Sequence, residues 1–232
     1  MSKAFLTVPL ALFLTIIVFL ACADFWMFNS VYIRKSYELG PYAAFSAQNT
    51  SKERVDEVTA RLLLFLDGGQ QDISDFFTPG EVSHLSDVRA LAAKGKNLML
   101  WSSILAILLI IALGAVSYLQ VPKLWFSQML KLVGIGITYA GILVLAGCGL
   151  LFVSFENFDA AFTGFHQVLF PQGNWQFPAG SHMITLFPEG FFSATGERIV
   201  LSAVICGLGL LLAGILLSRF GPLWKQIKRE DA

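Results

Sequence analysis

Residues 97–122 read NLMLWSSILAILLIIALGAVSYLQVP, which is 26 residues between Lys96 and Lys123 without one charged side chain. A helix rises 1.5 Å per residue, so this stretch is long enough to cross the roughly 30 Å hydrocarbon layer of a bilayer. Three further charge-free runs of comparable length are 4–23, 132–155 and 199–218. The sequence therefore predicts four transmembrane helices.

The composition of the whole chain agrees with a membrane protein. Only 14% of the 232 residues are charged and 21 are Phe, and the mean hydropathy is +0.67. A soluble domain of this size could not bury so much apolar surface in one core. Sixteen basic and sixteen acidic residues cancel, so the basic surface of a nucleic-acid-binding protein is missing. The composition excludes both a nucleic-acid binder and an ordinary cytosolic enzyme.

A fifth charge-free run, 160–188, is not predicted to cross the membrane. It contains several Gly, Pro, Asn and His residues, which interrupt a continuous helix. An interrupted helix cannot satisfy its backbone hydrogen bonds in lipid. Glycines within the four predicted spans, such as Gly134 and Gly207, instead allow neighbouring helices to approach closely.

Basic residues predict which side of the membrane each segment faces. They flank the spans at the two chain ends and at the turn between the second and third spans, whereas the stretch 154–196 has no Lys or Arg. By the positive-inside rule, both termini and that turn face the cytoplasm. The regions 29–96 and 154–196 therefore lie outside. The basic residues are Lys3, Lys123, Lys131, Arg219, Lys225, Lys228 and Arg229.

These boundaries predict an all-α membrane protein in which amphipathic helical regions cap the outer face of four transmembrane helices. The predicted segments are transmembrane helix 1 (1–28), an extracytoplasmic helical region (29–96), transmembrane helix 2 (97–122), a cytoplasmic turn (123–131), transmembrane helix 3 (132–155), an extracytoplasmic aromatic helix and loop (156–198), transmembrane helix 4 (199–218) and a cytoplasmic tail (219–232).

The first span has two interpretations. A basic residue, an apolar run and Ala21-Cys22-Ala23 also fit a signal peptide with a small-residue cleavage site. The aromatic residues Phe25, Trp26 and Phe28 follow, and they favour an uncleaved anchor because aromatic side chains concentrate at the membrane–water interface. We expect the anchor.

The first outer region is predicted to hold two amphipathic helices. Thr50 with Glu53, and Thr78 with Glu81, have the spacing of a capping box, in which each side chain caps the backbone N–H of the other residue. Apolar residues then recur at helical spacing. They are Val55, Val58, Leu62, Phe65 and Leu66 in the first helix and Val82, Leu85, Val88 and Ala92 in the second.

Two histidines lie beside such apolar faces. His84 is at the edge of the stripe that follows Glu81, and Asp87 is one turn further on, close enough to hold the imidazole. His166 lies beside an aromatic face, with Asp159 two turns earlier. That face consists of Phe155, Phe158, Phe162, Phe165 and Leu169.

An apolar neighbourhood favours the neutral imidazole, which is the form that a general base needs. His84 and His166 are therefore candidate catalytic residues. A zinc site that also uses His182 and Glu189 is the alternative, although these residues lack the spacing of a dedicated zinc motif. The chain has no P-loop, no G-x-S-x-G elbow and no HExxH helix, so a serine hydrolase or zincin is not indicated.

Four stretches in the outer regions resemble the bacterial lipoprotein intramolecular transacylases (Lit). They are Glu81-x-x-His84-x-x-Asp87-Val88, then Asn157-Phe158-Asp159-x-x-Phe162-x-x-Phe165-His166-x-x-Leu169-Phe170, then Trp175-x-Phe177, and Pro188-Glu189-x-Phe191-Phe192. The resemblance covers nearly the whole chain in order and topology. It implies a multi-pass protein of the bacterial cell membrane whose site lies on the extracytoplasmic side.

The resemblance also implies the reaction. The sn-2 acyl chain of a diacylglyceryl-Cys lipoprotein would move to the α-amino group of the same Cys, which gives a lyso-form lipoprotein. The family's catalytic pair corresponds to His84 and His166. We expect His84 to be the base on the amine, oriented by Asp87, and His166 to protonate the leaving oxygen, or the reverse. Asp159, Trp175 and Glu189 are expected to shape the pocket.

This reaction is expected to need no cofactor and no metal, and its partners are diacylglyceryl-modified lipoproteins and membrane lipids. General acid–base catalysis contributes about 10²–10⁴-fold, and holding amine and ester in one molecule contributes more. The alternative function is a non-catalytic outer-leaflet lipid-binding or membrane assembly protein. A transporter is disfavoured because the spans lack paired charges and inverted repeats.

Overall fold

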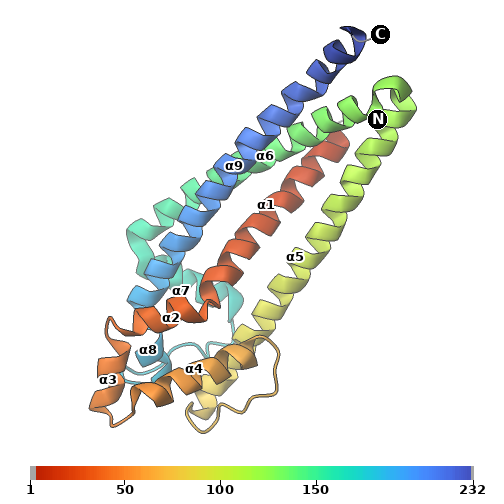
Figure 1. The fold of residues 1–232 in the computed structure, drawn as a ribbon. Helices are drawn as coiled ribbons and strands as arrows, with labels where there is room; N and C mark the ends of the chain where they lie inside the picture. The colour runs from red at the N-terminus through yellow and green to blue at the C-terminus, as the bar shows by residue number, and fades with distance from the viewer. Residues whose placement is uncertain (1–3, 231–232) are drawn as a thin grey trace. The chain divides into compact units, whose positions relative to one another are not determined.

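Four long helices account for most of the chain (Figure 1). The computed structural model describes residues 4–230, and the side chains of 5–153 and 156–219. Lys3 therefore lies outside the described residues. The long helices are α1 (Ala4–Met27), α5 (Pro79–Gln120), α6 (Trp125–Ser154) and α9 (Glu189–Glu230). Each is long and apolar enough to cross a membrane. No strand occurs in 4–230, so the predicted all-α membrane fold is confirmed.

The helices α5 and α9 are longer than a bilayer requires. At 1.5 Å per residue, the 42 residues of α5 span about 63 Å, twice what the bilayer needs. Within α5 the longest charge-free stretch is 97–120, which is its candidate membrane-spanning part, whereas 79–96 carries five charged residues. The corresponding part of α9 is 199–218. The outer helix and the span therefore form one continuous helix in α5, where the sequence suggested separate elements.

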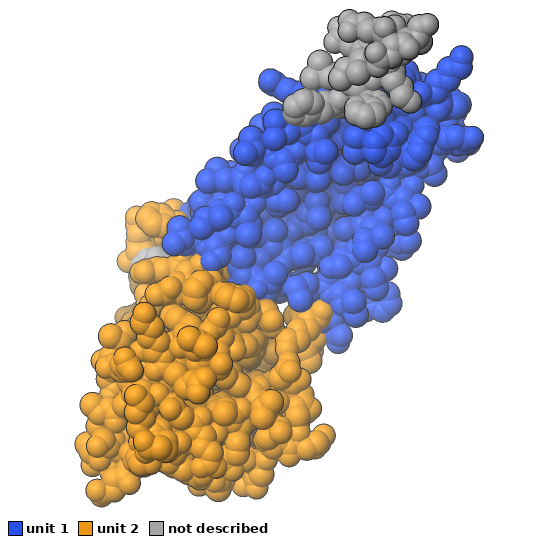
Figure 2. Space-filling view, viewed as in Figure 1, with its two compact units in different colours: residues 1–22, 97–151, 200–232 blue, residues 23–96, 152–199 orange. Residues whose placement is uncertain are grey.

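The chain divides into two compact units, coloured separately in Figure 2. Unit 1 contains residues 1–22, 97–151 and 200–232. Its buried contacts include Leu10 of α1, Leu113 of α5 and Leu132 of α6. The 3₁₀ turn η1 (Pro122–Leu124) connects α5 to α6. Unit 1 thus consists mainly of the four charge-free runs 4–23, 97–122, 132–155 and 199–218.

Small residues bring α6 and α9 together within unit 1. A Cβ atom added at Gly134 would lie 2.5 Å from the backbone nitrogen of Ser218, and one added at Gly214 would lie 2.5 Å from that of Thr138. The expected role of glycine in helix approach therefore holds at Gly134. It does not hold at Gly149, where an added Cβ meets nothing within 4 Å.

Replacing Gly134 with leucine is expected to destabilise unit 1, because the side chain would collide with backbone atoms that cannot rotate away. Overpacking of this kind costs about 1–3 kcal/mol. Thermal unfolding in detergent is the measurement, and Gly149→Leu on the same helix is the matched control. Equal melting temperatures for the two variants would contradict the close approach.

Unit 2 contains residues 23–96 and 152–199, and the shorter helices other than η1 lie in it. These helices are α2 (Ser30–Tyr37), α3 (Pro41–Ala47), α4 (Lys52–Leu66), η2 (Phe155–Asn157), α7 (Phe158–Leu169) and α8 (His182–Leu186). One apolar core holds α2, α3, α4 and α8 together with the first turns of α5 and α9. Its buried members are Ile33, Tyr37, Phe45, Val55, Val58, Leu62, Leu66, Ile73, Phe77, Leu85, Leu186 and Phe191.

The outer region before α5 departs from the sequence prediction in two ways. It has α2 and α3 in addition to the two expected helices. Helices this short are marginal alone, so burial of Ile33 and Phe45 in the shared core stabilises them. The N-cap of α4 is Ser51 rather than Thr50, because the Ser51 side chain accepts the hydrogen bond of the Arg54 N–H.

The capping box at the start of α5 forms as predicted. The Thr78 N–H donates to Glu81 Oε2 at 2.8 Å, and the Glu81 N–H donates back to Thr78 Oγ1 at 3.4 Å. Pro79 occupies the first helical position, where its missing N–H costs nothing. This cap fixes where α5 begins and so places His84 in its second turn.

Candidate active site

His84 of α5 and His166 of α7 face each other within unit 2. Their ring centroids are 6.1 Å apart and their planes are inclined by 30°. Both side chains are buried, with 6% and 8% of their surface exposed. The fold therefore brings together two imidazoles that are 82 residues apart in the chain.

Aromatic rings surround the histidine pair. Phe170 packs against both imidazoles, at centroid distances of 4.8 Å from His84 and 5.6 Å from His166. Phe162 lies 4.1 Å and Trp175 4.8 Å from the His166 ring. Trp175, a predicted site residue, therefore contacts one of the two histidines. The aromatic wall removes water from both rings.

This burial changes the pKa of each histidine. Desolvation, helped by the neighbouring His166, lowers the pKa of His84 from 6.5 to about 4, although Asp87 opposes the shift. Desolvation also lowers the pKa of His166, against a hydrogen bond to the Phe162 carbonyl. Both imidazoles are therefore neutral near pH 7, as a general base requires.

The hydrogen bond of His166 fixes its tautomer. Nδ1 of His166 lies 2.8 Å from the carbonyl oxygen of Phe162, one turn earlier in α7. A carbonyl oxygen only accepts hydrogen bonds, so Nδ1 must carry the proton. Nε2 of the neutral ring then holds a lone pair and is available as a base.

His84 offers an unsatisfied ring nitrogen. Its Nδ1 is buried and makes no hydrogen bond to any of the side chains or backbone groups that the structure describes. Leaving a buried polar atom unpaired costs about 1–3 kcal/mol. This nitrogen can exchange a proton with a bound group.

Asp87 holds the loop that covers the site. Its Oδ2 accepts hydrogen bonds from Asn174 Nδ2 at 2.6 Å and from Gln172 Nε2 at 2.8 Å. These bonds hold the pKa of the Asp87 carboxyl below its usual value. Within the described chain no hydrogen bond joins Asp87 to His84, so Asp87 acts on that ring only through its charge.

Glu81, which the sequence predicts to cap α5, also holds a second helix in place. Its side chain is 1% exposed, and its two oxygens serve different partners. Oε2 accepts from the N–H and hydroxyl of Thr78, whereas Oε1 accepts from the Met183 N–H at 2.8 Å. Glu81 thus attaches α8 to the first turn of α5, one turn before His84. Its position three residues before His84 was the only available signal.

The remaining predicted site residues lie elsewhere in unit 2. The side chain of Asp159 forms a hydrogen bond with Glu189 and repels it, which raises the pKa of Glu189. Both are exposed, and no described contact joins either one to the histidine pair. His182 packs on Phe76, and its Nδ1 lies 2.5 Å from the Phe76 carbonyl oxygen. His182 therefore has a structural partner of its own.

The alternative of a zinc site receives no support from this arrangement. Among the described residues, no group of three or more His, Cys, Asp and Glu side chains is close enough to share a metal ion.

The sequence analysis assigned no role to Phe170, Gln172 or Asn174. Their contacts depend on the way the loop after α7 folds back onto α5.

Comparisons with known proteins agree on one family. A family model described as lipoprotein intramolecular transacylase Lit matches residues 7–192. A solved structure of the membrane-integral lipoprotein intramolecular transacylase Lit from Bacillus cereus superposes with a TM-score of 0.74 and 17% identity, covering 97% of this chain and 98% of that one. No curated protein sequence matches the chain.

Two further structures of the Bacillus cereus enzyme are also similar. In one, a histidine is replaced by arginine, and the TM-score is 0.64 at 16% identity, with 99% and 95% of the two chains covered. In the other, a histidine is replaced by alanine, and the TM-score is 0.64 at 17% identity, with 98% and 96% covered. At these identities the superpositions show a shared fold.

Proposed function

The chain belongs to the lipoprotein intramolecular transacylase (Lit) family, and we propose that His84 and His166 are the residues that catalyse its acyl transfer. The protein is a multi-pass membrane acyltransferase that transfers an acyl chain within a lipoprotein. The observation that carries the proposal for the histidines is their 6.1 Å approach inside a buried aromatic wall.

The proposed substrate is a lipoprotein whose N-terminal Cys carries a diacylglyceryl group. The α-amino nitrogen attacks the carbonyl carbon of the sn-2 ester, so a C–N bond forms and the C–O bond breaks. The proton lost by the amine ends on the sn-2 oxygen. The products of this step are an N-acyl group and a free glyceryl hydroxyl on the same molecule, and atoms balance without water or a cofactor.

The tautomer of His166 supports the assignment in which His166, rather than His84, is the base on the amine. With its proton held at Nδ1 by the Phe162 carbonyl, His166 presents the lone pair of Nε2 to the attacking amine. His166 then delivers the proton taken from the amine to the departing sn-2 oxygen, and the neutral His84 ring beside it hydrogen-bonds to the charge that develops on the ester without changing its own protonation state. The Phe162 carbonyl still accepts from Nδ1 after His166 is protonated, and it stabilises the imidazolium that forms.

The aromatic wall contributes in two ways. Burial keeps both imidazoles neutral before the reaction, so neither has to lose a proton first. It also excludes water from the reacting ester, which would otherwise be hydrolysed. We further propose that this site faces the extracytoplasmic side and that both termini are cytoplasmic. The basic residues Lys123 and Lys131 at the turn between α5 and α6 support this orientation.

The reaction is tested by mass spectrometry of lipoprotein N-terminal peptides. Purified protein is mixed in liposomes with a synthetic diacylglyceryl lipopeptide that carries a labelled sn-2 chain. We expect the label to appear on the α-amino nitrogen of the same molecule. Label transferred to a second, unlabelled lipopeptide, or released as free fatty acid, would contradict the intramolecular reaction proposed for this substrate.

The pH dependence tests the state of the histidines. The α-amino group titrates near pH 8, so its neutral fraction falls tenfold per pH unit below that value. Desolvation lowers the pKa of both histidines, that of His84 to about 4, so each ring loses its proton at a lower pH than an ordinary histidine. The logarithm of kcat/KM is therefore expected to rise with a slope closer to one than to two between pH 5.5 and 6.5. A slope near two would show that a histidine with an ordinary pKa also has to lose a proton.

A further inference from the structure

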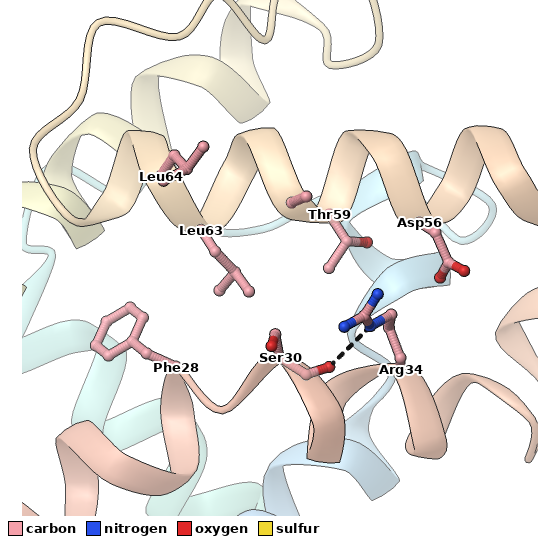
Figure 3. A pocket seen from close by; sticks show the side chains of 8 residues that line it. Phe28, Ser30, Arg34, Asp56, Thr59, Leu63 and Leu64 are labelled. Atoms are coloured by element: carbon pink, nitrogen blue, oxygen red, sulfur yellow. Dashed lines mark hydrogen bonds between the residues drawn. The ribbon is translucent and has the colours of Figure 1, made fainter.

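A cavity of about 400 Å³ lies in unit 2 (Figure 3), and neither His84 nor His166 lines it. It lies between α2 and α4, and it is lined by Phe28, Ser30, Arg34, Asp56, Thr59, Ala60, Leu63 and Leu64. On α4 the cavity residues Asp56, Ala60 and Leu63 follow one face. The core residues Val55 and Leu62 follow another, turned by more than 90°. The cavity is thus distinct from the candidate active site.

Two opposite charges line this cavity without forming an ion pair. Arg34 Nε donates to the Ser30 carbonyl oxygen at 3.3 Å, and its terminal guanidinium nitrogens make no hydrogen bond to any residue that the structure describes. Asp56 Oδ1 accepts from the Tyr42 hydroxyl at 2.6 Å, and within the same described residues Oδ2 has no hydrogen-bond donor. No ion pair of either residue occurs in the described part of the chain.

Apart from Ser30 and the buried Thr59, the rest of the lining is apolar, and part of it is exposed to the surroundings. Leu64 is 54% exposed, and Leu63 and Phe28 extend toward the gap between the helices in Figure 3. Phe28 directly follows Met27, the last residue of the membrane-spanning helix α1. By chain continuity, Phe28 of the lining lies next to the end of that helix, and lipid headgroups surround the ends of membrane-spanning helices.

We propose that this cavity binds the headgroup of an aminophospholipid, a phosphodiester that carries a primary ammonium group. The guanidinium of Arg34 suits a phosphate oxygen pair, and the carboxylate of Asp56 suits the ammonium. Phe28, Leu63 and Leu64 contact the glyceryl end of the acyl chains. The volume lies within the range of small-ligand sites and accommodates a headgroup rather than whole acyl chains.

The proposal is tested by native mass spectrometry of the full chain in detergent. Phosphatidylethanolamine, phosphatidylcholine and phosphatidylglycerol with the same acyl chains are added at equal mole fractions, and the retained lipid is counted. We expect retention of phosphatidylethanolamine to exceed that of phosphatidylcholine by roughly tenfold, because choline has no N–H to donate to Asp56. Equal retention of these two lipids would overturn the proposal.

Variants of the lining assign the binding to this cavity. Arg34→Gln is expected to lower retention of all three lipids, and Asp56→Asn to abolish only the preference for phosphatidylethanolamine. Lys35→Gln is the matched control, because Lys35 is a neighbouring cation on α2 outside the lining. Ala60→Trp fills the cavity without removing a charge and is expected to lower retention of every lipid. Unchanged retention in Arg34→Gln or Ala60→Trp, or an equal loss in Lys35→Gln, would overturn the proposal.

Acyl transfer is measured on the same samples, and it separates this proposal from the catalytic one. Arg34 and Asp56 make no described contact with His84 or His166. If a lining variant loses the lipid preference while acyl transfer continues, the result supports the cavity proposal and leaves the catalytic proposal unchanged. If the unaltered chain retains the lipid but transfers no acyl chain, the result contradicts the catalytic proposal and leaves the cavity proposal unchanged.

Discussion

Replacing His166 with glutamine is expected to lower the rate of acyl transfer by roughly 10²–10⁴-fold. The proposed base is the lone pair on His166 Nε2, which the hydrogen bond from Nδ1 to the Phe162 carbonyl keeps free of a proton. A glutamine amide has no titratable lone pair in the same pH range. The measurement is single-turnover conversion of a synthetic diacylglyceryl lipopeptide, followed by mass spectrometry.

His182→Gln is the matched control for this loss. His182 also bonds a backbone carbonyl through Nδ1 and also stacks on a phenylalanine, but it lies apart from the histidine pair. Its replacement is expected to leave transfer per folded molecule nearly unchanged. Replacing His84 together with His166 is expected to cost little more than either alone, because the two act on the same chemical step. Full activity in His166→Gln would reject its catalytic role.

Replacing Glu81 with alanine is expected to produce the largest loss of stability in unit 2. The change leaves the backbone N–H groups of Thr78 and Met183 without the carboxylate oxygens that accept from them. Each buried donor left unpaired costs about 1–3 kcal/mol, and a cavity adds to that loss. Thermal unfolding followed by circular dichroism is the measurement.

Glu53→Ala provides the comparison for Glu81. Glu53 lies in the first turn of α4, as Glu81 does in α5, but its side chain is exposed. Its replacement is expected to change stability by less than about 0.5 kcal/mol. Glu81→Gln is expected to be intermediate, because an amide oxygen accepts hydrogen bonds but one of the two carboxylate oxygens is lost. A Glu81→Ala protein as stable as Glu53→Ala would contradict the structural role described for Glu81.

Local spacing predicted contacts correctly only where no distant group competed. The Thr78–Glu81 capping box forms because both residues belong to the same helix end. The predicted bond between Asp87 and His84 has the correct helical spacing, yet the amides of Gln172 and Asn174 use the Asp87 carboxylate instead. Those amides come from a loop some 85 residues away, and no local pattern locates them.

The order of amino acids alone predicts four long apolar helices, because a charge-free run of more than about 20 residues has few alternatives to a helix in lipid. It also predicts the start of α5 and, through a family resemblance, which two histidines to compare. The packing of distant segments was needed to show that these imidazoles meet, that the Phe162 carbonyl fixes the proton of His166, and that Glu81 anchors α8. The two kinds of feature differ in how far apart along the chain the interacting residues lie. Membrane insertion and helix capping depend on neighbouring residues, whereas the site depends on burial against segments that are remote in the chain.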